Sequence, residues 1–190
     1  MFTIGLDISA LDADYKQHAA RGIGRYVAAL QRGLSAAAVK EVGIQFFDHR
    51  TLASWEWGER LLRWCPAGKT TLKNQLLYPL RLRRGRAFDV QAVHFPAHMD
   101  APSWCPLPCI VTVLDLIPLV LAHLYRPDRP GWRFELARRL ENRAIRKAAL
   151  VLAISRHTAR DVERLLGCLL YTSDAADDLL CVDLGGRRII

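Results

Sequence analysis

The sequence predicts an α/β fold built on a parallel sheet with helices on both faces. Short apolar runs of the length of a buried strand recur along the chain, and segments with helical periodicity separate them. Strands joined through helices run in the same direction, because the crossover returns the chain to the starting edge of the sheet. Several apolar runs end near a polar residue, which places polar side chains at the carboxyl edge, where such sheets bind ligands.

The first quarter of the chain predicts two strands and one helix. Phe2 to Ile8 is an apolar run with Asp7 near its end, as in a buried parallel strand. A polar loop over 9–21 leads to a helix from Gly22 to about Ala37, and Val42 to Phe47 predicts a second strand. The apolar positions of the helix recur every three to four residues and form one face: Ile23, Val27, Leu30 and Leu34.

The pattern weakens between residues 48 and 87. Three tryptophans and scattered arginines there indicate a variable, partly helical insertion, to which we assign no element. Val90 to His94 then predicts a strand that ends beside Pro96. Cys109 to Leu116 is the most strand-like run of the chain, and Pro118 stops it.

The last predicted elements are a helix, a strand and a helix. Arg133 to Ala148 predicts a basic amphipathic helix, and Leu150 to Ile154 predicts a buried strand. Ser155 is placed to cap a helix that runs to Leu166, because its hydroxyl can accept a backbone N–H that has no partner within the helix. The apolar positions of the basic helix include Phe134, Leu136, Leu140 and Ile145.

Length and composition fit one globular domain or a large fragment of two. About half of the 190 residues are apolar, and no run approaches the roughly 18 apolar residues of a membrane span. No basic segment precedes the first apolar run, so we expect no signal peptide and a cytoplasmic location. The formal net charge of +8 fits nucleic acid, an anionic membrane or a phosphorylated ligand, and equally an arginine-rich coding bias.

The cysteines indicate neither a disulfide framework nor a metal site. Their number is five, which is odd, and the chain carries no export signal. Cys105 and Cys109 lack a second Cys or His pair at ligand spacing. We therefore expect reduced thiols at a loop edge, and no metal.

The character of the sequence changes after Gly167. Residues 168–190 are acidic and unpatterned, and they begin Cys-Leu-Leu-Tyr-Thr-Ser-Asp-Ala-Ala-Asp-Asp. This string resembles a translated transposase adapter of the kind used in preparing sequencing libraries. We therefore expect residues 1–167 to form the domain and residues 168–190 to be a non-native, disordered tail. A natural acidic extension is the alternative.

Asp7, His94 and Asp115 stand at or near the ends of predicted strands. A neutral imidazole at His94 could accept a hydrogen bond from a ligand hydroxyl or stabilise a developing charge. From spacing alone, a histidine bonded to a neighbouring loop is the more common case. Asp115 could orient a hydroxyl, or it could initiate the turn before Pro118.

Gly22 and Gly24 open the first predicted helix. Two glycines let a ligand approach the backbone, and the N–H groups of a first helical turn favour anions, although a packing or turn role is as common. A dinucleotide fingerprint would need a third glycine and an acidic partner, which this stretch lacks. Gly68-Lys-Thr70 is not a P-loop, because Arg63 stands where that motif needs glycine.

In their order and spacing, five segments resemble family-4 glycosyltransferases of the GT-B fold. The resemblance covers essentially all of residues 1–167 apart from the insertion, and it implies the Rossmann-like, acceptor-side N-terminal half of a two-domain enzyme. The segments are Ile4-Gly-Leu-Asp7, Arg21-Gly-Ile-Gly-Arg-Tyr26, Val93-His-Phe-Pro96, Val111-Thr-Val-Leu-Asp-Leu-Ile-Pro118 and Leu150-Val-Leu-Ala-Ile-Ser-Arg-His-Thr158.

The resemblance also implies a reaction, the transfer of a sugar from a nucleotide diphosphate sugar to an acceptor hydroxyl with retained configuration. The donor is a substrate, and no further cofactor is implied. Gly22, Gly24 and Arg25 would border the donor's diphosphate, and His94 would face the transferred sugar. The resemblance implies a glycan or lipid-linked acceptor, and the usual setting of relatives is the synthesis of cell-surface polysaccharide.

Two features of the family's site are not matched. Asp115 corresponds to the second residue of a His-Asp pair, but Leu114 replaces the histidine. The basic pair and the two glutamates that hold the donor belong to the family's C-terminal domain, which residues 1–167 do not include. We therefore expect this chain alone to bind the donor poorly and to lack transferase activity.

Two other functions stay open at this point. A non-catalytic basic module could bind nucleic acid or, at the periphery of the inner membrane, acidic phospholipids, through the arginines of 81–86 and 133–147. A solvated helix face is the more common role of such clusters. No stacking aromatic residues are interleaved with them and no recognised nucleic-acid motif is present, which argues against nucleic acid. A one-domain protein could instead complete its site with another polypeptide.

Overall fold

The computed structural model describes residues 2–12, 22–37, 42–48, 73–84, 89–122, 124 and 131–168. These residues form a five-stranded, all-parallel sheet in the order β2-β1-β3-β4-β5. The predicted α/β, Rossmann-like fold is confirmed, and the arrangement is consistent with the N-terminal half of a GT-B fold. The strands are β1 (Phe2–Asp7), β2 (Val42–Phe47), β3 (Ala92–Phe95), β4 (Cys109–Val113) and β5 (Leu150–Ala153).

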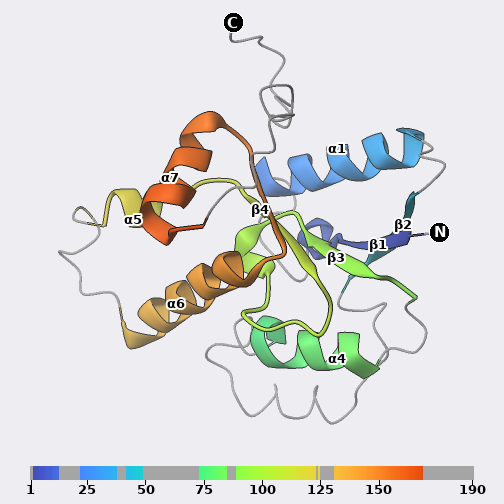
Figure 1. Ribbon diagram of the computed structural model, residues 1–190, viewed down its shortest axis with the longest axis horizontal. Coiled ribbons are helices and arrows are strands. Elements are labelled where there is room, and N and C mark those ends of the chain that lie inside the picture. The colour runs from blue at the N-terminus through green and yellow to red at the C-terminus, as the bar shows by residue number, and fades with distance from the viewer. Residues whose placement is uncertain are drawn as a thin grey trace, which may run out of the picture.

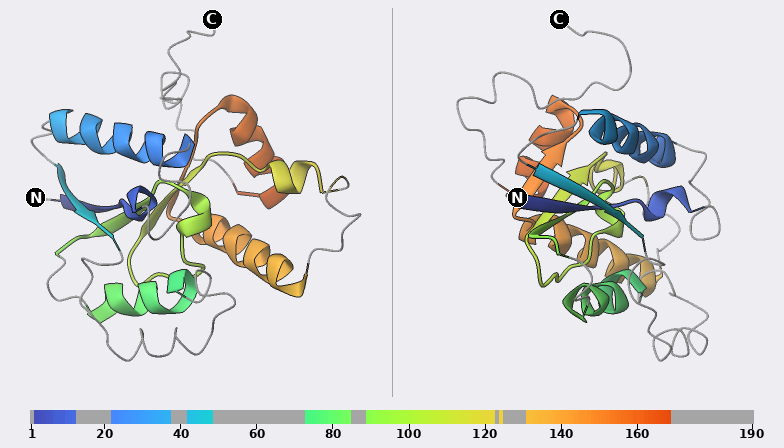
Figure 2. Two further views of the ribbon diagram at one scale, coloured as in Figure 1. Left: turned by 180° about the vertical axis from the view of Figure 1, so that it is seen from behind. Right: turned by 90° about the vertical axis from the view of Figure 1, so that its right-hand side faces the viewer.

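Helices cover both faces of the sheet (Figures 1 and 2). One face carries α1 (Gly22–Ala37), and the other carries α4 (Tyr78–Arg84) and α6 (Trp132–Lys147). The short helix α5 (Ile117–Val120) follows β4, and α7 (Arg156–Leu166) follows β5 and contacts both α5 and α6. Three single turns complete the described elements: η1 (Ser9–Leu11), η2 (Lys73–Leu77) and η3 (His98–Asp100).

The α4 face of the sheet carries an aromatic core. Phe47 of β2, Phe95 of β3 and Tyr78 of α4 meet with ring centroids 5.7–6.5 Å apart, in tilted and edge-to-face arrangements. Such pairs contribute about 0.5–1.5 kcal/mol each beyond the burial of their surface. Because side chains alternate across a strand, this contact also fixes which residues of β3 point to the opposite face, toward α1.

The segment left unassigned in the sequence contains a helical stretch, which begins in η2 and continues through α4. Apart from Pro79, its buried residues recur at the spacing of one helical face: Asn74, Leu77, Tyr78, Arg81 and Leu82. Two of the six buried residues, Asn74 and Arg81, are polar, so the apolar periodicity that marks a helix is masked in the sequence. The expectation of a solvated arginine cluster over 81–86 is wrong at Arg81, which is 7% exposed.

Two predicted strands have boundaries that differ from the structure by more than one residue. The strand expected to run to Leu116 ends at Val113, because the chain turns there and the N–H groups of Leu119 and Val120 bond to the Leu116 carbonyl. Pro118 sits in the first turn of α5, where a missing N–H costs nothing. The strand predicted over 90–94 spans Ala92–Phe95 instead.

The apolar face of α6 also differs from the prediction. Ile145 is buried, as expected, but Phe134 is 46% exposed and Leu136 is 45% exposed. The first half of α6 extends beyond the end of the sheet, so only its second half reaches the core (Figure 1). No helix in the described segments is long and apolar enough to cross a membrane.

Cys105 and Cys109 are free thiols, as predicted. Cys109 is not at a loop edge, however, because it opens β4 and is buried. The hydrogen bond with Cys105, and then burial, raise the pKa of the Cys109 thiol, whereas the same bond lowers the pKa of Cys105. The predicted tail, apart from Cys168, lies outside the described residues.

Ser155 caps α7 as the sequence predicts, since its Oγ accepts the backbone N–H of Thr158 at 3.1 Å. Ser155→Ala should therefore lower the free energy of unfolding by about 1 kcal/mol. Urea unfolding followed by circular dichroism measures the change. Ser35→Ala, at an exposed position within α1, is the matched control. Equal effects of the two substitutions would contradict the capping role.

Candidate functional site

The carboxyl edge of the sheet gathers the polar residues that the sequence singles out. Asp7 is the last residue of β1 and is 3% exposed. Its Oδ1 accepts hydrogen bonds from the Ser9 backbone N–H at 2.9 Å and the Ser9 hydroxyl at 2.6 Å. Asp7 thus holds the turn η1, which contacts α1.

His94 lies one residue before the end of β3 and is 8% exposed. It pairs in register with Leu6 of β1 and with Ile110 of β4. The side chain of Thr112, two residues after Ile110, therefore points to the same face of the sheet as His94. Its neighbour Phe95 points toward α4, so the imidazole of His94 points to the α1 face. The ring nitrogen Nε2 lies 2.9 Å from Oγ1 of Thr112. The partner is therefore an adjacent strand and not a loop.

Burial determines the charge state of His94. Removal from water lowers the pKa of the imidazole from 6.5 to about 4, because the protonated form loses the most solvation. The ring is therefore neutral near pH 7. A neutral ring can exchange hydrogen bonds with a hydroxyl, but it brings no positive charge to an anionic ligand.

The N-terminus of α1 lies at the same edge and over the same face as His94 (Figure 1). Gly22 and Arg25 are exposed, and Gly24 is buried. A Cβ built on Gly22 would meet open space, so packing does not require glycine at this position. The φ angle of Gly22 is not in the left-handed region, so backbone strain does not require glycine either. Gly22, the first residue of α1, thus has open space beside its backbone. The N–H groups of this first turn would favour an anion by about 0.3–1 kcal/mol per charge.

Asp115 lies in a different environment, beyond the end of β4. It is exposed, and its Oδ1 accepts the backbone N–H of Ile117 at 3.2 Å, so it does initiate the turn before Pro118. It also lines a pocket of about 120 Å³ between α5, η3 and α6. The apolar wall of this pocket comprises Leu116, Pro118, Leu119, Phe134 and Ala137.

The polar wall of the pocket is formed by Asp115, His98, Arg138, Glu141 and Asn142. Nη2 of Arg138 donates to both carboxylate oxygens of Glu135 at 2.8 and 2.9 Å, and the guanidinium lies 5.6 Å from the centre of the Phe134 ring. Its Nη1 donates to the Pro118 carbonyl at 3.4 Å, so Arg138 is held in place by both α6 and α5.

Sequence reasoning missed His98. Within the described part of the chain, its Nδ1 is buried without a hydrogen-bond partner, and the residue is 9% exposed. Burial lowers the pKa of His98, and the nearby carboxylate of Asp115 raises it in part. A buried polar group with no partner costs about 1–3 kcal/mol. The signal was present in the sequence as a second histidine four residues after His94, but nothing in the spacing showed where it would point.

The structure thus divides the predicted residues into two groups. Gly22, Gly24, Arg25 and His94 belong to the α1 face, whereas Asp115 faces His98 and α6. Among the described residues, no group of three or more His, Cys, Asp or Glu side chains could hold a metal ion.

Comparison with known proteins gives one match. The sequence model of a family described as Glycosyltransferase Family 4 matches residues 20–169, which include both groups of residues. No curated protein and no solved structure matches the chain.

The lowered pKa of His94 predicts a pH-dependent stability. Between about pH 6.5 and 4 the unfolded chain binds a proton at His94 and the folded chain does not, so the free energy of unfolding falls as the pH falls through this range. The loss should reach about 3 kcal/mol. His94→Gln keeps an amide to bond Thr112 and should remove this part of the slope. Urea unfolding at pH 7 and pH 4.5 measures it.

His157→Gln is the control, because His157 is exposed on α7. The assignment fails if His94→Gln retains the full pH dependence of the parent chain.

Proposed function

The chain belongs to Glycosyltransferase Family 4, and from this membership we propose that it is the acceptor-side half of a sugar transferase. The reaction proposed is transfer from a nucleotide diphosphate sugar to an acceptor hydroxyl, with retention at the anomeric carbon. Synthesis of cell-surface polysaccharide is the proposed setting. Beside the family membership, the observation that supports the proposal is that α1 begins with open space at Gly22 at the same carboxyl edge of the sheet at which β3 carries the neutral, buried His94.

The two parts of this edge suit the two parts of the donor. The diphosphate would approach the N–H groups at Gly22 and Gly24, with Arg25 as an exposed positive charge beside them. The transferred sugar would lie beside His94, whose neutral ring can bond a sugar hydroxyl. Thr112 holds the ring in place from the adjacent strand. This chain offers little to stabilise the leaving diphosphate, so that task falls to the second domain.

Acceleration of the transfer would then come from two sources. The second domain would supply the positive charge that stabilises the diphosphate as it departs. The described half would supply orientation, by fixing the sugar against His94 and the acceptor against the edge of the sheet.

The open space at Gly22 gives a direct test. In the enzyme completed by its C-terminal domain, Gly22→Ala should place a methyl group between the first turn of α1 and the diphosphate. We expect the apparent affinity for the donor to fall by about tenfold, which corresponds to about 1.4 kcal/mol. Initial rates over a range of donor concentrations measure it.

Gly33→Ala is the matched control, because a Cβ there also meets open space and Gly33 lies within the same helix. Neither substitution should weaken the fold, since alanine favours helix over glycine. Equal donor affinities in the two variants would contradict the proposed place of the diphosphate.

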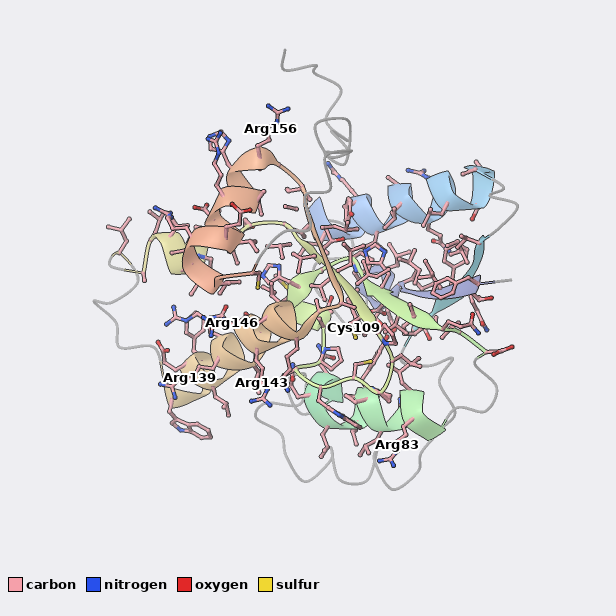
Figure 3. All side chains as sticks on the ribbon, viewed as in Figure 1. Arg83, Cys109, Arg139, Arg143, Arg146 and Arg156 are labelled. Carbon is pink, nitrogen blue, oxygen red and sulfur yellow. The ribbon has the colours of Figure 1, made fainter. Side chains whose placement is uncertain are left out.

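A peripheral contact with an anionic membrane is a second proposal, and the exposed face of α6 favours it. Trp132 and Leu136 are 71% and 45% exposed, and Arg139 and Arg143 follow them at helical spacing. Figure 3 shows Arg139 and Arg143 projecting from α6, away from the sheet. An exposed aromatic residue beside basic ones is typical of helices that lie in a membrane interface.

Vesicles containing acidic phospholipid test this contact. The double variant Arg139→Ser/Arg143→Ser should bind them about tenfold or more weakly, since each basic residue near such a surface contributes about 1 kcal/mol. Arg156→Ser/Arg160→Ser removes the same charge from exposed positions of α7 and is the control. Sedimentation with vesicles measures binding, and an equal loss in both variants would refute a contact through α6.

A further inference from the structure

Two thiols meet at the amino edge of the sheet, opposite the carboxyl edge that carries the candidate functional site. Cys109 is the first residue of β4, and its backbone carbonyl accepts the N–H of Ala149 at 2.8 Å. The carbonyl of Pro108 accepts the N–H of Val93 at 2.9 Å, so the chain on both sides holds this end of β4. Cys109 is part of the buried core (Figure 3), and Cys105 packs against that core from the loop before the strand.

The thiols of Cys105 and Cys109 are hydrogen-bonded to each other, and both are free. The thiol of Cys109 also lies 3.5 Å from the carbonyl oxygen of Leu107. Pro106 and Pro108 stand between the two cysteines, and the fixed φ of proline leaves this short loop few other conformations. The two sulfur atoms are therefore held close together, and a disulfide requires only that they move from hydrogen-bond contact to bonding distance.

The two thiols differ in their access to solvent. Cys105 is half-buried and lies between the exposed residues Trp104 and Pro106, whereas Cys109 is 8% exposed. The hydrogen bond between the thiols lowers the pKa of Cys105 and raises the pKa of Cys109. The thiolate is the reactive form of cysteine, so reactivity is concentrated on the sulfur that solvent can reach. An accessible thiol of low pKa beside a second, protected thiol is the arrangement of redox-sensitive cysteine pairs.

We propose that Cys105 and Cys109 form a redox-active dithiol, which small organic disulfides oxidise to an internal disulfide. The Cys105 thiolate attacks one sulfur of the small disulfide, forms a mixed disulfide with it and releases the other half as a thiolate. The Cys109 thiol then gives its proton to solvent, and its sulfur attacks Sγ of Cys105 and releases the second half as a thiolate. The chain loses two electrons and two protons, and the small disulfide is reduced to two thiols.

The first step prepares the second. Once Cys105 is part of a mixed disulfide it carries no charge, so its contribution to the raised pKa of Cys109 disappears and the second thiol can ionise. An excess of a small thiol reverses both steps. The site lies at the other edge of the sheet from Gly22 and His94, and the inference does not rest on the proposed transferase function.

The test uses the full chain with oxidised glutathione as the probe. The folded chain is incubated with the probe, quenched in acid, unfolded, alkylated and digested with trypsin without reduction. The tryptic peptide 87–133 contains Cys105 and Cys109 and no other cysteine, so mass spectrometry of this peptide reads the pair alone. We expect it to lose two hydrogen atoms and to take up no alkyl group. Reduction before alkylation should restore two alkylated cysteines.

Single substitutions separate the roles of the two thiols. Cys109→Ser should stop the reaction at the first step, so that peptide 87–133 carries one glutathione on Cys105. Cys105→Ser should leave Cys109 to react about tenfold more slowly or less, because its thiol is buried. Cys168→Ser removes a half-buried thiol at the end of α7 and is the control, since it should leave the internal disulfide unchanged.

Circular dichroism establishes that each variant is folded, and Cys109→Ala replaces Cys109→Ser if that variant is not. The peptide map of the parent chain decides the question even without the variants. The inference is overturned if excess oxidised glutathione leaves peptide 87–133 with two free thiols, if the parent chain stops at a mixed disulfide on Cys105, or if either cysteine is instead linked to another peptide. None of these results bears on the donor test at Gly22.

Discussion

The candidate site depends on one constraint, that parallel strands joined through helices all end at the same edge of the sheet. β1, β3 and β4 lie side by side. The sheet therefore brings to one edge three residues that are far apart in the sequence: Asp7, His94 and Asp115. The same crossover geometry starts α1 at that edge. A strand register shifted by one residue would turn His94 from the α1 face into the aromatic core of the α4 face.

Two buried histidines four residues apart, His94 and His98, differ in whether a neighbouring strand supplies a hydrogen-bond partner for the ring. Burial lowers the pKa of both, so both are neutral near pH 7. His94 is in a strand and finds Thr112 on the next strand, which fixes its ring before any ligand binds. His98 is in η3, beyond the end of the sheet, where no neighbouring strand supplies a partner. The proposed place of the transferred sugar beside His94 relies on this fixed ring.

Much of the fold could be predicted from the sequence, and the reasons are local. The helix from Gly22 to Ala37 has regular apolar spacing, and the cap at Ser155 needs only one hydroxyl at one position. The stretch around α4 could not be predicted, because Asn74 and Arg81 occupy buried positions of its face. The exposure of Phe134 depends on where α6 extends past the sheet, which no local pattern encodes. Of the site, the residues at strand ends could be predicted, but the division into two faces and the burial of His98 required the tertiary structure.

The claim that this chain is the acceptor-side half of a two-domain transferase is tested most directly at the codon for Gly167. Adapter-free, long-read sequencing of the source DNA across that codon shows how the natural reading frame continues. We expect it to continue into a second α/β domain that carries a basic pair and two spaced glutamates, the groups needed to hold the donor. A frame that instead runs through residues 168–190 and stops would contradict the two-domain account. It would favour a protein that completes its site with another polypeptide, or one that binds without catalysis.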